Sequence, residues 1–189
     1  MVFAKGKKIR RIGIGEYYAS ASPMVISTLL GSCVAVCLWD PVKKIGGMNH
    51  ILLPGKADMQ HFNTPARFGV NAMELLINEI ISLGGRKKDL VAKIFGGSNI
   101  YPVLAENFAP GPRIVAFVKE FLALEPIEII NENTGGTDTR VIYFHTDTGD
   151  VFLKRTVSSM RERLVSQENK MLRKLKEEAA KLADIEWFH

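Results

Sequence analysis

Two stretches of the chain carry apolar residues at the three- and four-residue spacing of a buried helix face. The first begins at Thr64-Pro65, where a hydroxyl can cap the helix and proline fits the first turn, and it ends at Gly84-Gly85. The second begins at Pro112 and ends before Pro126. Both patterns predict helices that cover a sheet. Their apolar faces consist of Phe68, Ala72, Leu75, Leu76 and Ile80 and of Ile114, Phe117, Val118, Phe121 and Leu122, respectively.

Shorter apolar and β-branched runs, bounded by Gly, Pro, Asp and Asn, predict strands on both sides of each helix. Strand pairs separated by helices indicate an α/β fold, a layered single domain of mixed, largely antiparallel sheets covered by helices. We expect the last three strands to be neighbours and the last two to form a hairpin. The predicted strands are Cys33–Trp39, Ile45–Leu53, Val91–Phe95, Ile127–Ile130, Thr139–His145 and Asp150–Arg155.

The C-terminal segment is highly charged but keeps an apolar stripe at heptad-like steps, which predicts a long amphipathic helix. We therefore divide the chain into a domain of residues 1–156 and a helical extension of residues 157–189. The helix either packs back on the domain or meets a helix of another protein, with Trp187 and Phe188 as an anchor at its tip. The stripe consists of Val165, Leu172, Leu175, Ala179 and Leu182.

Composition fits one folded domain, because 189 residues with 47% hydrophobic side chains can bury a full core. No basic and apolar leader and no long apolar run is present, so we expect a cytoplasmic protein without membrane insertion. The net charge of +5 gathers near the two ends, without the interleaved aromatics of a nucleic-acid module. Cys33 and Cys37 would lie more than about 12 Å apart on one strand, which is too far for a disulfide.

Cys33 begins the first strand of a predicted hairpin whose second strand contains His50. If Pro41 and Val42 are the central turn residues, Cys33 lies directly opposite His50, with Cβ atoms about 4.5 to 5.5 Å apart. A longer loop would slip this register. A neighbouring imidazole can take the thiol proton, and the thiolate is the attacking species. The hairpin therefore predicts a cysteine nucleophile with a histidine base.

Residues just before Cys33 suit the other needs of such a site. Gly31 and Ser32 predict a tight turn whose backbone N–H groups can point at a developing oxyanion. A third group usually orients the histidine, and the hydroxyls of Ser27 and Thr28 are candidates. A cysteine and a histidine in an apolar hairpin are nevertheless more often core residues than catalysts. The pattern alone does not decide between these interpretations.

Several separated blocks of the sequence carry more specific information. They are Ile12-Gly-Ile-Gly-Glu-Tyr17, Leu30-Gly-Ser-Cys-Val-Ala-Val-Cys37, Asp40-Pro41, Gly47-Met-Asn-His-Ile-Leu-Leu-Pro54, Phe95-Gly-Gly-Ser-Asn99 and Asn133-Thr-Gly-Gly136 with Arg140. In content and order, these blocks resemble the signature of the chemoreceptor glutamine deamidase family, CheD. The resemblance covers residues 12 to about 155. It implies an α/β layered fold with mixed sheets.

The resemblance also implies roles for individual residues. Cys33 corresponds to the nucleophile of the family and His50 to its base. The family has a threonine six residues before the cysteine, and this chain has Ser27 there, so Thr28 next to it competes for the orienting role. We expect no metal or cofactor here.

Other chemistries find little support. Gly13-Ile14-Gly15 lacks the third glycine and the following helix of a dinucleotide fingerprint, and no phosphate-binding loop is present. Cys33, Cys37, His50 and His61 lack the paired Cys-x-x-Cys spacing of a zinc site. We interpret His61 as a surface-loop residue.

Two functional hypotheses follow. The first is a protein-glutamine deamidase that converts specific glutamines of methyl-accepting chemotaxis receptors to glutamate, and whose site can also hydrolyse receptor glutamyl methyl esters. The second is a regulatory docking protein that binds the receptor or a CheC-type phosphatase and has little catalytic activity. Cys33 and His50 favour the enzyme, whereas Ser27 and the added helix favour a regulatory role.

Overall fold

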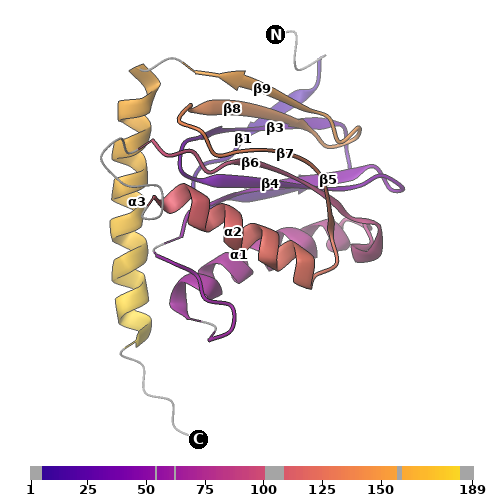
Figure 1. The fold of residues 1–189 in the computed structure, drawn as a ribbon. Helices are drawn as coiled ribbons and strands as arrows, with labels where there is room; N and C mark the ends of the chain where they lie inside the picture. The colour runs from indigo at the N-terminus through magenta and orange to yellow at the C-terminus, as the bar shows by residue number, and fades with distance from the viewer. Residues whose placement is uncertain (1–5, 54, 62, 101–108, 157–158, 184–189) are drawn as a thin grey trace, which may run out of the picture.

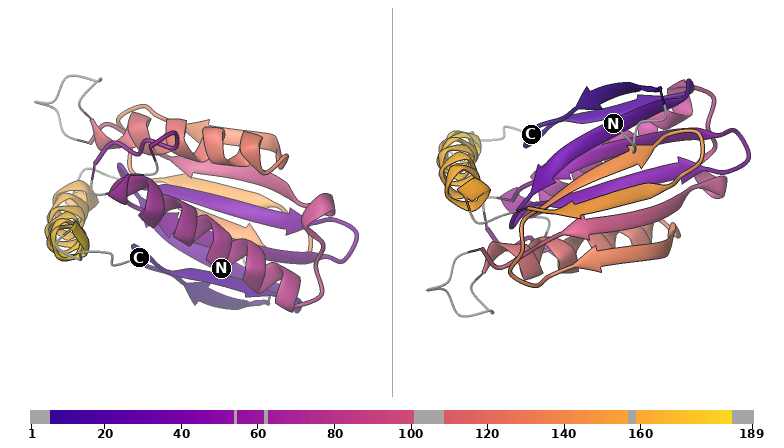
Figure 2. Two further views of the ribbon diagram at one scale, coloured as in Figure 1. Left: turned by 90° about the horizontal axis from the view of Figure 1, so that it is seen from below. Right: turned by 90° about the horizontal axis from the view of Figure 1, so that it is seen from above.

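Two β-sheets pack face to face in the computed structural model, which describes residues 6–53, 55–61, 63–100, 109–156 and 159–183. Two helices, α1 (Thr64–Ser82) and α2 (Pro110–Leu124), cover the outer face of the larger sheet, and a third, α3 (Ser159–Ala183), runs across one end of both sheets (Figure 1). Views from below and above show these layers separately (Figure 2). The predicted layered α/β fold with a C-terminal helix is confirmed.

The larger sheet has the strand order β2-β5-β4-β6-β7. Its strands pair antiparallel except β6 and β7, which are parallel because α2 carries the chain back across the sheet. The helices pack closely where a Cβ on Gly69 of α1 would lie 2.3 Å from the Phe117 ring of α2. The strands are β2 (Tyr17–Ser20), β5 (Ile45–Ile51), β4 (Val34–Asp40), β6 (Val91–Gly96) and β7 (Glu128–Thr134), and a short 3-10 helix, η1 (Lys87–Asp89), precedes β6.

The smaller sheet has the strand order β1-β3-β8-β9. One of its faces packs on the larger sheet, and Ile26, Ile142 and Phe144 are fully buried there. Alternation of buried and half-buried residues along β8 fits a sheet with one covered face. The strands are β1 (Lys8–Arg11), β3 (Met24–Leu30), β8 (Arg140–His145) and β9 (Val151–Arg155).

Two local predictions are wrong. Strand β7 does not neighbour β8, because it pairs with β6 and the Thr134-Gly135-Gly136 segment leads the chain into the other sheet. The β8–β9 hairpin is confirmed. The cap of α1 is Asn63 and not Thr64, since Asn63 Oδ1 accepts the Ala66 N–H at 3.0 Å.

The register of the β4–β5 hairpin also differs from the prediction. Asp40 pairs with Ile45 across a four-residue turn, and its carboxylate accepts the N–H groups of Val42 and Lys43 at 2.9 Å each. His50 therefore lies opposite Ala35, and Cys33 is not directly opposite His50. A shift of two residues keeps every side chain on its predicted face.

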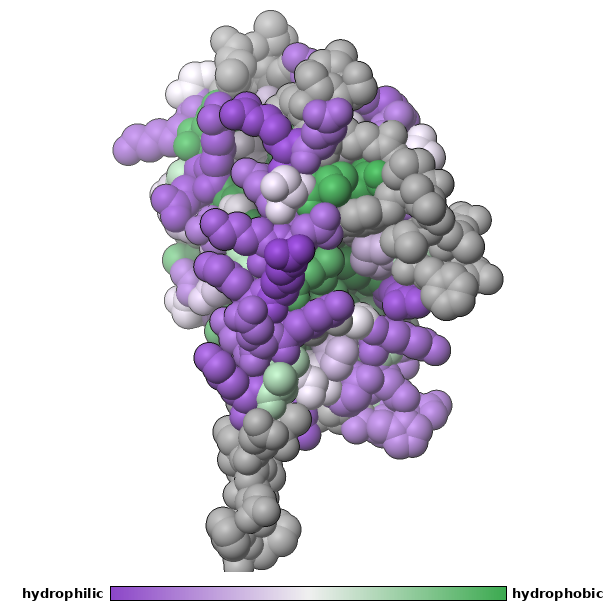
Figure 3. Space-filling model, turned by 90° about the vertical axis from the view of Figure 1, so that its left-hand side faces the viewer, coloured by the Kyte–Doolittle hydropathy of each residue, from purple (hydrophilic) through white to green (hydrophobic). Residues whose placement is uncertain are grey.

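Helix α3 packs back on the domain, as one of the two alternatives predicted. Leu164 and Glu168 are buried, and Met171, Leu172 and Leu175 are half-buried against the core. On the side of the molecule where α3 lies, the surface is largely hydrophilic, with apolar surface beside the helix (Figure 3). The predicted anchor, Trp187 and Phe188, lies outside the described residues. Among the helices that the structure describes, none is long and apolar enough to cross a membrane.

Candidate active site

The turn that joins β3 to β4 carries Cys33 and lies beneath α3. Backbone hydrogen bonds fix it from the loop after β6, because Ser98 N–H donates to Gly31 O at 2.8 Å and Gly97 N–H donates to Cys33 O at 2.7 Å. Gly96 is required beside this turn. Its φ is +105°, and a Cβ there would lie 2.2 Å from Cys33 O. Cys33 is thus completely buried in a turn with fixed backbone.

Arg140 supports this turn from the smaller sheet. Its guanidinium donates to Asn133 O and Oδ1 at 2.6 Å each, to Gly135 O at 2.5 Å and to Ser98 Oγ at 2.8 Å. Because Ser98 also holds Gly31 O, one buried cation connects the Asn133-Thr-Gly-Gly136 loop to the cysteine turn. These contacts therefore connect three of the sequence blocks described above, which contain Cys33, Ser98 and Asn133.

His50 is held between the two sheets by Thr28 of β3. Thr28 Oγ1 lies 2.7 Å from His50 Nδ1 and donates to Ile12 O at 2.8 Å. Since the hydroxyl has one proton and the carbonyl can only accept, both contacts are hydrogen bonds only if Nδ1 carries a hydrogen. Nε2 is then the nitrogen with the free lone pair. Among the described residues, buried Nε2 has no hydrogen-bond partner.

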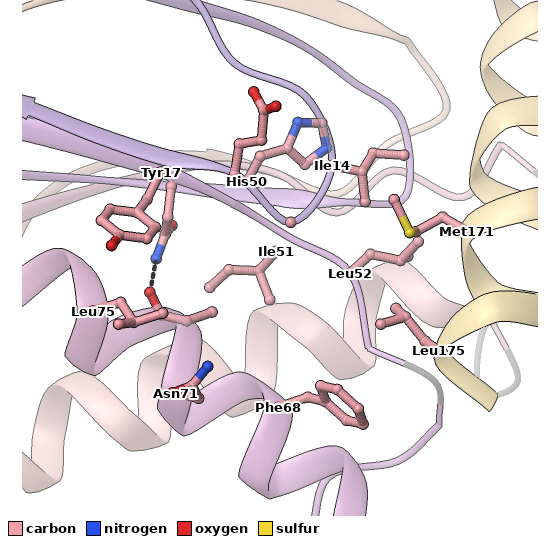
Figure 4. A pocket seen from close by; sticks show the side chains of 14 residues that line it. Ile14, Tyr17, His50, Ile51, Leu52, Phe68, Asn71, Leu75, Met171 and Leu175 are labelled. Atoms are coloured by element: carbon pink, nitrogen blue, oxygen red, sulfur yellow. Dashed lines mark hydrogen bonds between the residues drawn. The ribbon is translucent and has the colours of Figure 1, made fainter. Parts of the chain in front are cut away.

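Burial determines the charge of this imidazole. His50 is 3% exposed, and burial lowers its pKa to about 3. The ring is therefore neutral at physiological pH and can accept a proton at Nε2. A pocket opens beside it, with residues from β5, α1 and α3 on its walls (Figure 4). Its apolar lining includes Ile14, Leu52, Phe68, Leu75, Met171 and Leu175.

Cys33 and His50 are diagonal neighbours by register. Cys33 comes one residue before Val34, which pairs with Ile51. If the ladder is extended by one residue, Cys33 lies opposite Leu52. His50 comes two residues before Leu52, so its side chain lies on the same face of the sheet as that of Cys33. Cα atoms of such diagonal pairs lie about 7 to 8 Å apart. No hydrogen bond joins the thiol to the imidazole among the described residues.

Glu168 of α3 is the site residue that sequence reasoning missed. It is fully buried, and its carboxylate accepts the Ser32 N–H at 3.0 Å and a hydrogen bond from the Ser32 hydroxyl. Cys33, the next residue, also interacts with this carboxylate through its backbone N–H and its thiol. The available signal was a carboxylate on an apolar stripe, since Glu168 lies four residues after Leu164 and three before Met171.

The same contacts change the acidity of the thiol. Burial raises the pKa of Cys33 well above its usual value, and the Glu168 carboxylate raises it further. Burial also raises the pKa of Glu168, partly offset by its hydrogen bonds to Ser32 and Cys33. With α3 in this position, Cys33 is a thiol and not a thiolate.

Comparisons with known proteins identify the family of the chain. Residues 52–155 match the family described as CheD chemotactic sensory transduction. A "Probable chemoreceptor glutamine deamidase CheD" from Thiobacillus denitrificans is 40% identical over 86% of this chain and 81% of its own. The chain belongs to the CheD family. Proteins named "Probable chemoreceptor glutamine deamidase CheD 2" from Shewanella oneidensis and Chromobacterium violaceum are 46% and 41% identical, over 70% and 92% of this chain and 69% and 87% of theirs.

The family match begins just after His50, so the roles of the individual site residues rest on geometry. Ser27 and Thr28 are both buried, but successive residues of a strand point to opposite faces, and only Thr28 contacts His50. Gly31 and Ser32 lie in the predicted turn next to Cys33.

The remaining candidates lie away from this CheD-family site. Cys37 is buried within β4, and burial raises its pKa. His61 is exposed and contacts Asp58 at 2.9 Å, as expected of a surface loop. Within the described part of the chain, no group of three or more His, Cys, Asp or Glu side chains forms a metal site.

Proposed function

We propose that this chain is a protein-glutamine deamidase that acts on chemotaxis receptors, with Cys33 as nucleophile and His50 as base. The observation that carries the proposal is the convergence of two backbone N–H groups and a thiol on one carboxyl group. A carboxylate stands in for the carboxamide of a substrate glutamine, which has the same shape. The names of the relatives, chemoreceptor glutamine deamidases, supply the substrate class.

The first half of the reaction forms a thioester. Cys33 passes its proton to His50 Nε2, and Sγ attacks the carboxamide carbon. The N–H groups of Ser32 and Cys33 stabilise the oxyanion, a contribution of about 2.7 to 4 kcal/mol for a single donor in a comparable site. His50 then donates the proton to the leaving nitrogen, and ammonia departs. Thr28 fixes the tautomer that these transfers need.

The second half hydrolyses the thioester. Water gives a proton to His50 Nε2 while its oxygen attacks the carbonyl carbon, and the thiol is released as the C–S bond breaks. The net change is carboxamide plus water to carboxylic acid plus ammonia. A glutamyl methyl ester gives the same acyl group with a better leaving group, so we propose that it is a second substrate.

The test is ammonia release from a purified receptor fragment, with the converted glutamines located by peptide mass spectrometry. Wild-type chain should convert specific glutamines, and Cys33→Ala and His50→Ala should lower kcat by about a hundredfold or more. Cys37→Ala is the matched control, because it removes a second buried thiol from the adjacent strand and should retain turnover. Equal rates for wild type and Cys33→Ala would contradict the proposal.

One observation favours the second candidate, a docking protein with little activity that binds the receptor or a CheC-type phosphatase. The Cys33 thiol is buried under Glu168 and its pKa is raised. Docking alone predicts receptor binding that is equal in wild type and Cys33→Ala and no glutamine conversion by either.

A further inference from the structure

We propose that α3 occupies the substrate site of this same domain as a product-like helix, with Glu168 in the position that a substrate glutamine takes. A receptor helix must displace α3 before its own glutamine reaches Cys33. This inference rests on the proposed function and adds to it a mode of regulation and a recognition pattern for the substrate.

The contacts of Glu168 are those expected of a bound product. Deamidation converts a glutamine side chain into a glutamate side chain, and Glu168 is a glutamate whose carboxylate lies on the Ser32 and Cys33 N–H groups and on the thiol. A carboxylate has no leaving group that the thiol can expel, so this complex is unreactive. The side chain is completely buried, although a free carboxylate favours water. The hydrogen-bond donors around the carboxylate compensate for its burial.

Around Glu168, helix α3 packs directly against the turn that carries Cys33, as a bound substrate helix would. A Cβ on Gly31 would lie 2.7 Å from Leu164 Cδ2 and 2.8 Å from Glu168 Oε1, so α3 rests directly on the cysteine turn. One and two turns further along, Met171 and Leu175 close the pocket beside His50 (Figure 4). Apolar residues thus stand at positions −4, +3 and +7 relative to Glu168.

This spacing defines the kind of helix that can replace α3 in the groove, which is the surface that α3 covers beside Cys33 and His50. An amphipathic helix with a glutamine on its apolar stripe, flanked by apolar residues at −4, +3 and +7, can make the same contacts. The groove then selects glutamines by the helix face on which they lie. While α3 covers the site, the Cys33 thiol stays protonated, because its burial and the negative charge of Glu168 both raise its pKa.

The sharpest test makes the chain its own substrate. In Glu168→Gln, a carboxamide replaces the carboxylate with almost no change of shape. Cys33 Sγ bonds to its carbon, His50 protonates the departing ammonia, and water cleaves the thioester to regenerate the thiol and glutamate at position 168. Trypsin releases residues 164–170 as one peptide, which also contains Gln167. Fragmentation of this peptide distinguishes residue 168 from its neighbour.

We expect position 168 of the Glu168→Gln chain to be recovered as glutamate, while Gln167, which is exposed, remains glutamine. The double variant Glu168→Gln/Cys33→Ala should retain the carboxamide at position 168, and Glu168→Gln/Cys37→Ala should be converted. An unconverted carboxamide at position 168, in a preparation that deamidates the receptor fragment, would overturn this inference and leave the proposed function intact. An unconverted carboxamide without receptor deamidation would refute the proposed function as well.

A second variant tests displacement directly. Leu164→Ala removes a buried contact of α3 and leaves Cys33, His50 and Glu168 unchanged, so kcat/KM for the receptor fragment should rise about tenfold. Lys174→Ala, on the exposed face of the same helix, should match wild type. An unchanged or lower kcat/KM for Leu164→Ala would exclude α3 as an inhibitory helix.

Discussion

Thr28 Oγ1 lies 2.7 Å from His50 Nδ1, and this contact joins the two sheets at the site. Because the Thr28 hydroxyl also donates to Ile12 O, it fixes the hydrogen of the imidazole on Nδ1. The segment around Ile12 is held in turn, since Gly15 N–H donates to His50 O and His50 N–H donates to Glu16 O. The N-terminal sequence block therefore helps to orient the base.

Replacement of Thr28 should lower kcat without unfolding the protein. Thr28→Val keeps the shape but removes the hydroxyl that sets the tautomer, so receptor deamidation should slow by about tenfold or more. Thr28→Ser should retain most activity because it keeps the oxygen. Ser27→Ala is the matched control on the opposite face of β3 and should stay close to wild type. An equal loss in Ser27→Ala would reverse the assignment of the orienting residue.

The sequence predicts the parts of this site that depend on local pattern. The two covering helices, the β4–β5 and β8–β9 hairpins, and the placement of Cys33 and His50 on one face all follow from periodicity and turn residues. The exact register does not, because Asp40 stabilises a four-residue turn through two side-chain hydrogen bonds. Glu168 is 136 residues from its partner Ser32, and its role depends on where α3 docks. No local pattern specifies such a long-range contact.

Arg140 should be more important for stability than its neighbour Arg155. Arg140→Met removes four hydrogen bonds that the buried guanidinium donates to Asn133, Gly135 and Ser98, so the free energy of unfolding should fall by about 2 to 4 kcal/mol. Arg155 pairs with Arg140 across β8 and β9, but its ion pair with Asp138 is more than half exposed. Arg155→Met should cost about 1 kcal/mol or less.

Urea denaturation measures both variants. Iodoacetamide labelling of Cys33 provides the second readout, because loss of Arg140 releases Ser98 and through it the cysteine turn. Labelling should become faster in Arg140→Met and remain as in wild type in Arg155→Met. Equal stability of the two variants would show that the buried guanidinium does not support the turn.

The cap of α1 can be tested in the same way. Asn63 Oδ1 accepts the N–H groups of Ala66 and Asp58, and Nδ2 donates to Lys56 O, each at 3.0 Å. Asn63→Ala should therefore lower the free energy of unfolding by about 1 kcal/mol or somewhat more. Thr64→Ala should change it by less than about 0.5 kcal/mol. A larger loss in Thr64→Ala would restore Thr64 as the cap.

Burial of His50 should make the stability of the protein depend on pH. The pKa of His50 is about 3 in the folded chain and about 6.5 when unfolded, so the unfolded state binds the proton more tightly. Stability from the neutral imidazole is present above pH 6.5 and is lost as the pH falls below it, by at most about 1.4 kcal/mol per pH unit. The free energy of unfolding in urea, measured between about pH 7.5 and 5.0, should show this slope. His50→Gln has no proton to bind and should show a smaller slope, so parallel curves for the two proteins would contradict the buried, neutral imidazole.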